Sequence, residues 1–218
     1  MPGQPTSNPS DPDLLDAWRG GQSLAGEQLV RRHYRAVERF FANKVTLENV
    51  PDLAQETFVR CVEARDRIDD AARFRPYLLS IAYRVFCAHL RQAYRLGPSA
   101  NLDDITLEAV GGASPSSLFV REREQRLLLA GLRAISVNYQ VVLELHYWEE
   151  LTTNEIAAVL DIPAPTARSR LRRARDALEA AMAAMARTPA LLDSTLTRLE
   201  DWVELCRHQL AGPEGERA

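Results

Sequence analysis

The stretch with the clearest chemistry in this chain runs from Pro163 to Arg175, where five arginines occur without an acidic residue. Arginine guanidinium groups donate paired hydrogen bonds to phosphate oxygens and to the edge of guanine. A run of this kind indicates contact with a polyanion, and with nucleic acid in particular. Pro163 and Pro165 suit the opening of a helix, because proline has no amide N–H to donate inside one.

A short helix ahead of this stretch completes a helix-turn-helix pattern. Thr152 and Glu155 have the spacing of a capping box, which satisfies the free amides at a helix start. Asp161 stands where the chain must turn, and a short polar side chain tolerates left-handed backbone better than most. Such a unit places its second helix in the major groove of DNA. The alternative is a solvated arginine-rich helix end, which the helix dipole also favours. The cap, the turn and the proline-led second helix together favour the helix-turn-helix.

A second basic segment lies between Arg73 and Arg95, again with five arginines and no acidic residue. A helix beginning at Pro76 would separate a stripe of arginines from an apolar side. The stripe would hold Tyr77, Arg84, Ala88, Arg91 and Arg95, and the apolar side Leu78, Ile81, Ala82, Val85, Phe86 and Leu90. Arginines interleaved with aromatic residues suit single-stranded nucleic acid. The alternative is that Phe74, in the loop before this helix, and Tyr77 are core residues beside solvated arginines.

The helix expected after Asn49 carries a polar patch. Asp52, Gln55 and Glu56 are spaced i, i+3 and i+4, so they share one outward face. The inward face would consist of Leu53, Phe58, Cys61 and Val62. Acidic residues in a first helical turn are also favoured by the dipole alone. On physical grounds, therefore, the patch needs no binding role.

Several classes of function find no support in the sequence. Three isolated cysteines and four unclustered histidines have no metal-ligand spacing, so we expect neither a metal site nor a disulfide framework. Phosphate loops and hydrolase motifs are missing, so we expect no cofactor and no enzyme. We find no signal peptide and no apolar run of membrane-spanning length. These features, with a net charge of −3, predict a cytoplasmic protein without membrane insertion.

The chain is predicted to be all-α, because no segment alternates long enough for a strand. We expect two helical modules joined by a flexible linker, with an additional helix at the C-terminal end. The predicted boundaries are a disordered segment at 1–12, modules at 13–96 and 118–187, a linker at 97–117 and the extension at 188–218.

In this arrangement the chain resembles the extracytoplasmic-function (ECF) sigma factors of bacterial RNA polymerase. DLAQETF at 52–58 is similar to the family's DLVQEVF, and FRPYL at 74–78 to its F-x-x-W-L. Residues 151–175 resemble the family's LSYEEIAEILGVPVGTVKSRLHRAR. The match covers roughly residues 13–185. The resemblance implies sigma region 2 in the first module and sigma region 4 in the second.

The resemblance also implies roles for individual residues. The residues implied to bind core polymerase are Asp52, Gln55 and Glu56, which overrides the physical interpretation of that patch. Those implied to read and hold the melted −10 element are Phe74, Arg75, Tyr77, Arg84, His89 and Arg91. Those implied to bind the −35 element are Thr166, Arg168, Ser169, Arg172, Arg173 and Arg175.

The implied function is that of a non-catalytic polymerase subunit that directs transcription initiation. Its partners would be core RNA polymerase and promoter DNA, with an anti-sigma factor as a further candidate, and it would associate with the nucleoid in the holoenzyme. One alternative is a helix-turn-helix regulator that binds operator DNA without entering the polymerase. Another is a helical protein–protein adaptor whose arginines bind nothing.

Minimal members of this family end soon after the second helix of the helix-turn-helix, whereas this chain continues into the extension. Its apolar residues step by four and three, giving an a/d seam of Leu192, Leu196, Leu199, Val203, Cys206 and Leu210. We expect this seam to pack against the second module. The alternative is a regulatory helix that covers a binding face or docks an anti-sigma factor.

Overall fold

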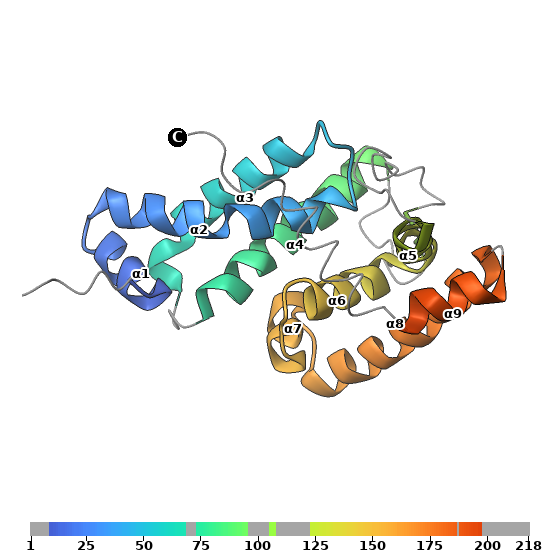
Figure 1. The fold of residues 1–218 in the computed structure, drawn as a ribbon. Coiled ribbons are helices and arrows are strands. Elements are labelled where there is room, and N and C mark those ends of the chain that lie inside the picture. Colours follow the sequence, from blue (N-terminus) through green and yellow to red (C-terminus); the bar gives the residue numbers. More distant parts are fainter. Residues whose placement is uncertain (1–8, 69–72, 96–104, 108–122, 187, 198–218) are drawn as a thin grey trace, which may run out of the picture.

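The computed structural model describes residues 9–68, 73–95, 105–107, 123–186 and 188–197. Over these residues the protein is helical, as the sequence predicts. The first module comprises α1 (Asp11–Arg19), α2 (Ser23–Ala42), α3 (Val50–Ala64), a 3-10 turn (Arg65–Arg67) and α4 (Phe74–Ala93). The second comprises α5 (Arg123–Ala134), α6 (Val137–Tyr147), α7 (Thr153–Leu160) and α8 (Ala164–Met185), followed by α9 (Pro189–Thr197). Figure 1 shows the first module in blue and green above the second in yellow to red.

The first module is a bundle in which α2 packs against α1, α3 and α4. Its centre is aromatic: Phe40 makes edge-to-face contacts with Phe41 and Phe86, and all three rings are buried. Such contacts contribute beyond the area that they bury. In this way the apolar side predicted for the fourth helix comes to lie in the core, including Leu78, Ile81, Ala82, Val85, Phe86 and Leu90.

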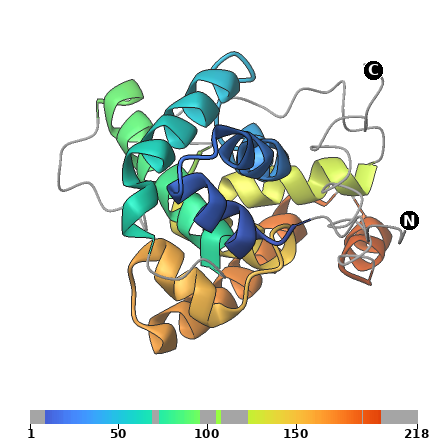
Figure 2. The same ribbon diagram turned by 90° about the vertical axis from the view of Figure 1, so that its left-hand side faces the viewer.

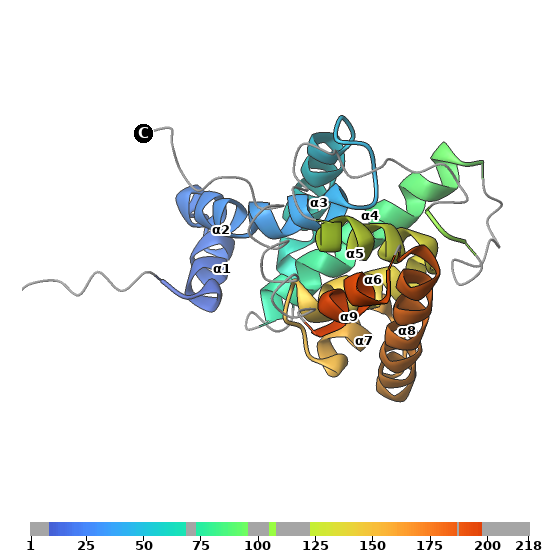
Figure 3. The same ribbon diagram turned by 45° about the vertical axis from the view of Figure 1, so that its right-hand side comes forward.

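The second module is assembled around α8, which packs against α5, α6 and α7. The buried face of α8 repeats every three or four residues, as a helix period requires, and consists of Ala167, Leu171, Ala174, Leu178 and Met182. Gly131 of α5 allows close approach here, because a Cβ atom would lie 2.8 Å from Cγ of Met182. Figure 3 shows α8 at the side of the molecule, with α9 and α6 beside it.

The two modules are in contact. Helix α4 of the first module lies along α7 of the second. Figure 2, turned by 90° from Figure 1, shows the start of α4 next to the orange helices of the second module. Part of the predicted linker also takes part in the fold. Leu107 is fully buried, and the backbone carbonyl of Ile105 accepts a 2.8 Å hydrogen bond from Val137. The remainder of 97–117 lies outside the described residues.

The first helix begins earlier than the composition suggests. Helix α1 starts at Asp11, inside the segment expected to be disordered. Ser10 and Asp13 form a capping box, and the Asp11 carboxylate lies 2.6 Å from both Arg32 and His33. A side-chain cap and two cationic or polar partners therefore fix residues that a polar composition alone assigned to a loose terminus. Residues 1–8 lie outside the described part.

Three details near α3 and α4 differ from what the sequence suggests. Val62 was expected to face inward and is 42% exposed, because the neighbouring Cys61 occupies the core position. Asn49 precedes α3 but makes no side-chain cap hydrogen bond. Helix α4 begins at Phe74 and not at Pro76. Pro76 is tolerated inside the first turn, because the first four amides of a helix have no intrahelical partner.

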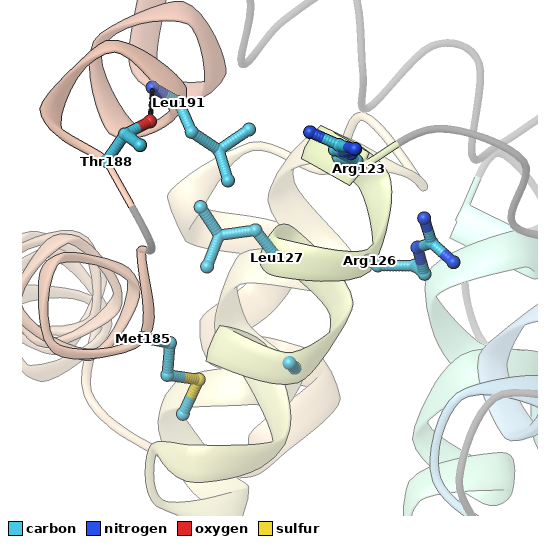
Figure 4. A pocket seen from close by; sticks show the side chains of 7 residues that line it. Arg123, Arg126, Leu127, Met185, Thr188 and Leu191 are labelled. Carbon is cyan, nitrogen blue, oxygen red and sulfur yellow. Dashed lines mark hydrogen bonds between the residues drawn. The ribbon is translucent and has the colours of Figure 1, made fainter.

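The described part of the extension packs on the second module. Helix α9 contacts α5 and α8, and Leu191 and Leu192 lie against the core. The described portion thus agrees with the intramolecular packing that we expected for the seam. The side chains of the seam from Leu196 onward lie outside the described residues. Between α5, the end of α8 and the start of α9 is a cavity of about 610 Å³, shown in Figure 4, with Arg123 and Arg126 at its edge and Leu127, Met185 and Leu191 on its apolar wall.

Candidate nucleic-acid and polymerase interfaces

Helices α7 and α8 form the predicted helix-turn-helix. The Thr152 hydroxyl accepts a 3.3 Å hydrogen bond from the amide of Glu155, and the Glu155 carboxylate accepts a 2.8 Å bond from the amide of Thr152. Asp161 ends α7 in left-handed backbone, with φ of 53° and ψ of 51°. Pro163 occupies the position just before α8, and Pro165 lies in the first turn of that helix. All four features were predicted from the sequence, because each is a local property of two to four residues.

The outer face of α8 carries the exposed arginines. Arg168, Arg172 and Arg175 are spaced i, i+4 and i+7, and all are exposed on one side of the helix. Arg173 is exposed beside them, whereas Thr166 and Ser169 are half-buried. The Ser169 hydroxyl donates a 3.0 Å hydrogen bond to the backbone carbonyl of Thr166, one turn earlier in the helix. The structure therefore brings the six candidate −35 residues to one end of α8.

One of these arginines is held by residues that the sequence did not single out. Arg175 donates a 3.2 Å hydrogen bond to Nε2 of His146, and its guanidinium lies 5.4 Å from the centroid of the Tyr147 ring. Since arginine can only donate, Nε2 of His146 must be the acceptor, and Nδ1 then donates to the Leu151 carbonyl at 3.2 Å. Helix α6 thus orients Arg175. No local pattern indicated this, because His146 and Arg175 are 29 residues apart in the sequence.

The candidate −10 residues on α4 fall into two groups. Arg84 and Arg91 are exposed on the predicted stripe, together with Ala88 and Arg95. Phe74 is buried, with its ring 5.2 Å from that of His33. For Phe74 the structure therefore matches the core alternative left open by the sequence.

The remaining −10 candidates are partly covered. Tyr77 and His89 are half-buried. Burial lowers the pKa of His89, and the nearby Glu56 carboxylate opposes that shift, so the imidazole lies close to α3. Arg75 is half-buried and bound to the second module: its Nη2 lies 2.5 Å from a carboxylate oxygen of Glu149.

The polar patch on α3 is exposed as predicted. Asp52, Gln55 and Glu56 all face solvent, while Leu53, Ala54 and Phe58 of the same helix are buried. Glu56 makes a 2.6 Å ion pair with Arg60, one turn further on. An exposed pair of this kind contributes little to stability, so the patch is free to bind a partner at small cost to the fold.

The described residues give no sign of metal or membrane chemistry. Among them, no three histidine, cysteine or acidic side chains gather as a metal site would require. None of the described helices is both long enough and apolar enough to cross a bilayer.

Comparison with known families decides between the possible classes of protein. The sigma-70 region 2 family matches residues 29–107, and the sigma-70 region 4 family matches residues 125–178. These are the first module, from α2 onward, and the helix-turn-helix module. The chain belongs to the sigma-70 family. It is an ECF sigma factor, a non-catalytic subunit that serves RNA polymerase in promoter recognition and transcription initiation.

Similar proteins agree with this assignment. The ECF RNA polymerase sigma-E factors of Salmonella typhimurium (strain LT2) and Escherichia coli (strain K12) are each 28% identical to this chain over 177 residues, covering 78% of this chain and 93% of the relative. The structure of CnrH in complex with the cytosolic domain of CnrY matches 81% of this chain and 99% of CnrH, with a TM-score of 0.58 and 25% identity. The sigma factor RpoE of Bartonella quintana, solved with the anti-sigma factor NepR, matches 72% of this chain at a TM-score of 0.54 and 16% identity, which supports the fold.

Proposed function

We propose that this ECF sigma factor binds core polymerase through the α3 patch, recognises −35 duplex through α8, and holds the melted −10 strand on α4. The single observation that carries the proposal is the occurrence of an exposed acidic patch and a presented arginine face on separate modules of one chain. An operator-binding regulator would need the arginine face and would have no use for the patch.

The packing of α8 in the second module supports the −35 assignment. Its inner face is buried in the second module, so the arginine face is fixed in direction. Exposed arginines repeating at i, i+4 and i+7 can follow a groove edge over two turns of helix. In this proposal Arg168, Ser169 and Arg172 reach base edges, and Arg173 and Arg175 hold phosphates.

The −10 assignment rests on Arg84, His89 and Arg91, with Arg75 and Tyr77 at the start of the same helix. Exposed guanidinium groups along α4 suit a single strand, because cations bind its phosphates while bases stack on rings. Tyr77 is the candidate ring that is partly accessible in this conformation. We propose that the protein acts in the cytoplasm, where the polymerase and the chromosome are.

We also propose that an anti-sigma factor can bind this chain. The support is that CnrH was solved with the cytosolic domain of CnrY, and RpoE with the anti-sigma factor NepR. Co-purification of the full chain with a cytosolic protein that abolishes polymerase binding would test this.

The experiment that tests the main proposal is binding of the purified chain to core RNA polymerase. A Gln55→Ala, Glu56→Ala double variant should lose most of the affinity. The matched control is Glu27→Ala, Gln28→Ala on α2, since both residues are exposed and Glu27 pairs with Arg31 as Glu56 pairs with Arg60. Equal binding by both double variants would contradict the assignment of the α3 patch, and no binding by the wild type would favour the operator-binding regulator.

A further inference from the structure

Glu149 joins the two modules through buried charges. It lies between α6 and α7 and is 2% exposed. Arg39 of α2 donates to both of its carboxylate oxygens, at 2.7 Å and 3.0 Å, and Arg75 of α4 donates to one of them at 2.5 Å. A bidentate arginine–carboxylate pair to which a second arginine also donates is a strong and directional arrangement.

A second buried pair lies one turn away. Lys44, the only lysine in the chain, is buried against Glu144 of α6, and both charges are shielded from solvent. The same carboxylate accepts hydrogen bonds from Asn43 at 3.2 Å and from Gln140 at 2.8 Å. We refer to Arg39, Lys44, Arg75, Glu144 and Glu149 as the ion cluster. Three of its members come from the first module and two from the second.

The interface that contains the ion cluster is incompletely satisfied. Oδ1 of Asn43 and Oε1 of Gln140 are buried in the described structure without a hydrogen-bond partner. Buried polar atoms without partners cost free energy, and buried ion pairs lose much of their attraction to desolvation. Separation of the modules would return all these groups to water. The directional ion pairs therefore fix how the two modules pack, while the unsatisfied polar atoms lower the cost of separating the modules.

We propose that the ion cluster holds the free chain in a closed form in which Arg75 and the first turn of α4 are held against the second module, while the −35 surface stays exposed. Nη2 of Arg75 is bound to Glu149 and its side chain is half-buried, and α7 lies along α4, so a single strand has less access to the start of α4 than to Arg84 and Arg91. The arginines of α8 remain exposed in the same structure. The closed form therefore binds duplex DNA and binds single-stranded DNA poorly. The statement about single strands rests on the −10 role proposed above.

The test of closure is small-angle X-ray scattering on the full chain. The variant is Glu144→Gln, Glu149→Gln, and the matched control is Glu63→Gln, Glu179→Gln, which removes the same charge at exposed positions, one in each module. The wild type and the control should have the same radius of gyration, near the value for a compact chain of this length, about 17 Å plus the contribution of its ends. The ion-cluster variant should be larger with unchanged helical content by circular dichroism.

A charge swap distinguishes separation of the modules from a general loss of folding. Lys44→Glu and Glu144→Lys should each open the chain, and the double swap should restore the compact form. A wild type that already scatters as two separated modules would overturn the proposal. So would an ion-cluster variant as compact as the control, or a double swap that stays as open as the single variants.

DNA binding then separates this proposal from the −10 assignment. Random-sequence single-stranded and duplex oligonucleotides serve as probes. The opened variant should bind the single strand about 10-fold more tightly or better, a change of about 1.4 kcal/mol, and bind the duplex as the wild type does. Failure to open would contradict the closed form. Opening without any gain in single-strand binding would contradict the −10 role of α4 instead.

Discussion

Replacement of Arg172 by alanine is the most informative single perturbation of the DNA-binding surface. Arg172 is exposed on α8 and makes no hydrogen bond or ion pair with any other described residue, so its loss removes no such contact from the fold. Alanine is also the better helix former. Any loss of DNA affinity is therefore a loss of contact with DNA, which makes the energy of that contact directly measurable.

The magnitude follows from the geometry of the guanidinium group. If Arg172 binds a guanine edge with two hydrogen bonds, its removal should cost ~1–3 kcal/mol, and preference at one base pair should relax. That cost corresponds to a rise in Kd of roughly 5- to 150-fold. Arg172→Lys should lose the base preference as well, because an ammonium group keeps the charge and lacks the planar fork.

The assay is fluorescence anisotropy with a −35 duplex and with duplexes that carry single base-pair changes, at several salt concentrations. Arg31→Ala on α2 is the control, since Arg31 is an exposed arginine of the other module. A loss that is equal for all duplexes, together with a salt slope reduced by about 1, would refute base readout and make Arg172 a phosphate contact.

Three further predictions concern the fold that positions these surfaces. Asp161→Gly should raise the free energy of unfolding by up to about 1 kcal/mol, since glycine adopts left-handed backbone without strain, and a thermal midpoint that falls would contradict this. Gly26→Ala should destabilise the first module by about 1–3 kcal/mol in chemical denaturation, because a Cβ atom would lie 2.5 Å from the Trp18 ring, and an unchanged midpoint would show that the ring can move. Burial lowers the pKa of His33 below 6.5 despite the opposing Asp11 carboxylate, so the unfolded state takes up the proton first and stability should fall as pH drops below about 6.5. A His33→Gln variant should show a flatter pH profile between pH 7 and pH 5, and an identical profile would contradict the assignment.

Local features of the fold could be predicted from the sequence. The capping box of Thr152 and Glu155, the left-handed Asp161 and the proline-led start of α8 each depend on neighbouring residues. The apolar side of α4 followed from helix periodicity. In each case the information lies within one or two helical turns, and tertiary contacts reinforce it.

Long-range features could not be predicted in this way. Phe74 was expected to be a candidate for base stacking, and it is buried because α2 brings His33 against it. Glu149 looked like one of many acidic residues, yet it binds two arginines that lie 110 and 74 residues earlier in the sequence. The orientation of Arg175 by His146 has the same origin. Helix periodicity predicts which face of a helix is buried, but it does not predict which residues of another module contact that face.

If this chain carries core polymerase to promoters, reconstituted holoenzyme should start transcription at defined sites. Core RNA polymerase would be combined with the purified chain and a library of genomic fragments, and the 5′ ends of the transcripts would be mapped. We predict discrete start sites with shared elements near −35 and −10. We also predict that two double variants abolish these start sites: Arg168→Ala with Arg172→Ala, and Gln55→Ala with Glu56→Ala. The control double variant, Glu27→Ala with Gln28→Ala, should keep them. The same scattered starts with and without the chain would show that it does not direct the polymerase to promoters.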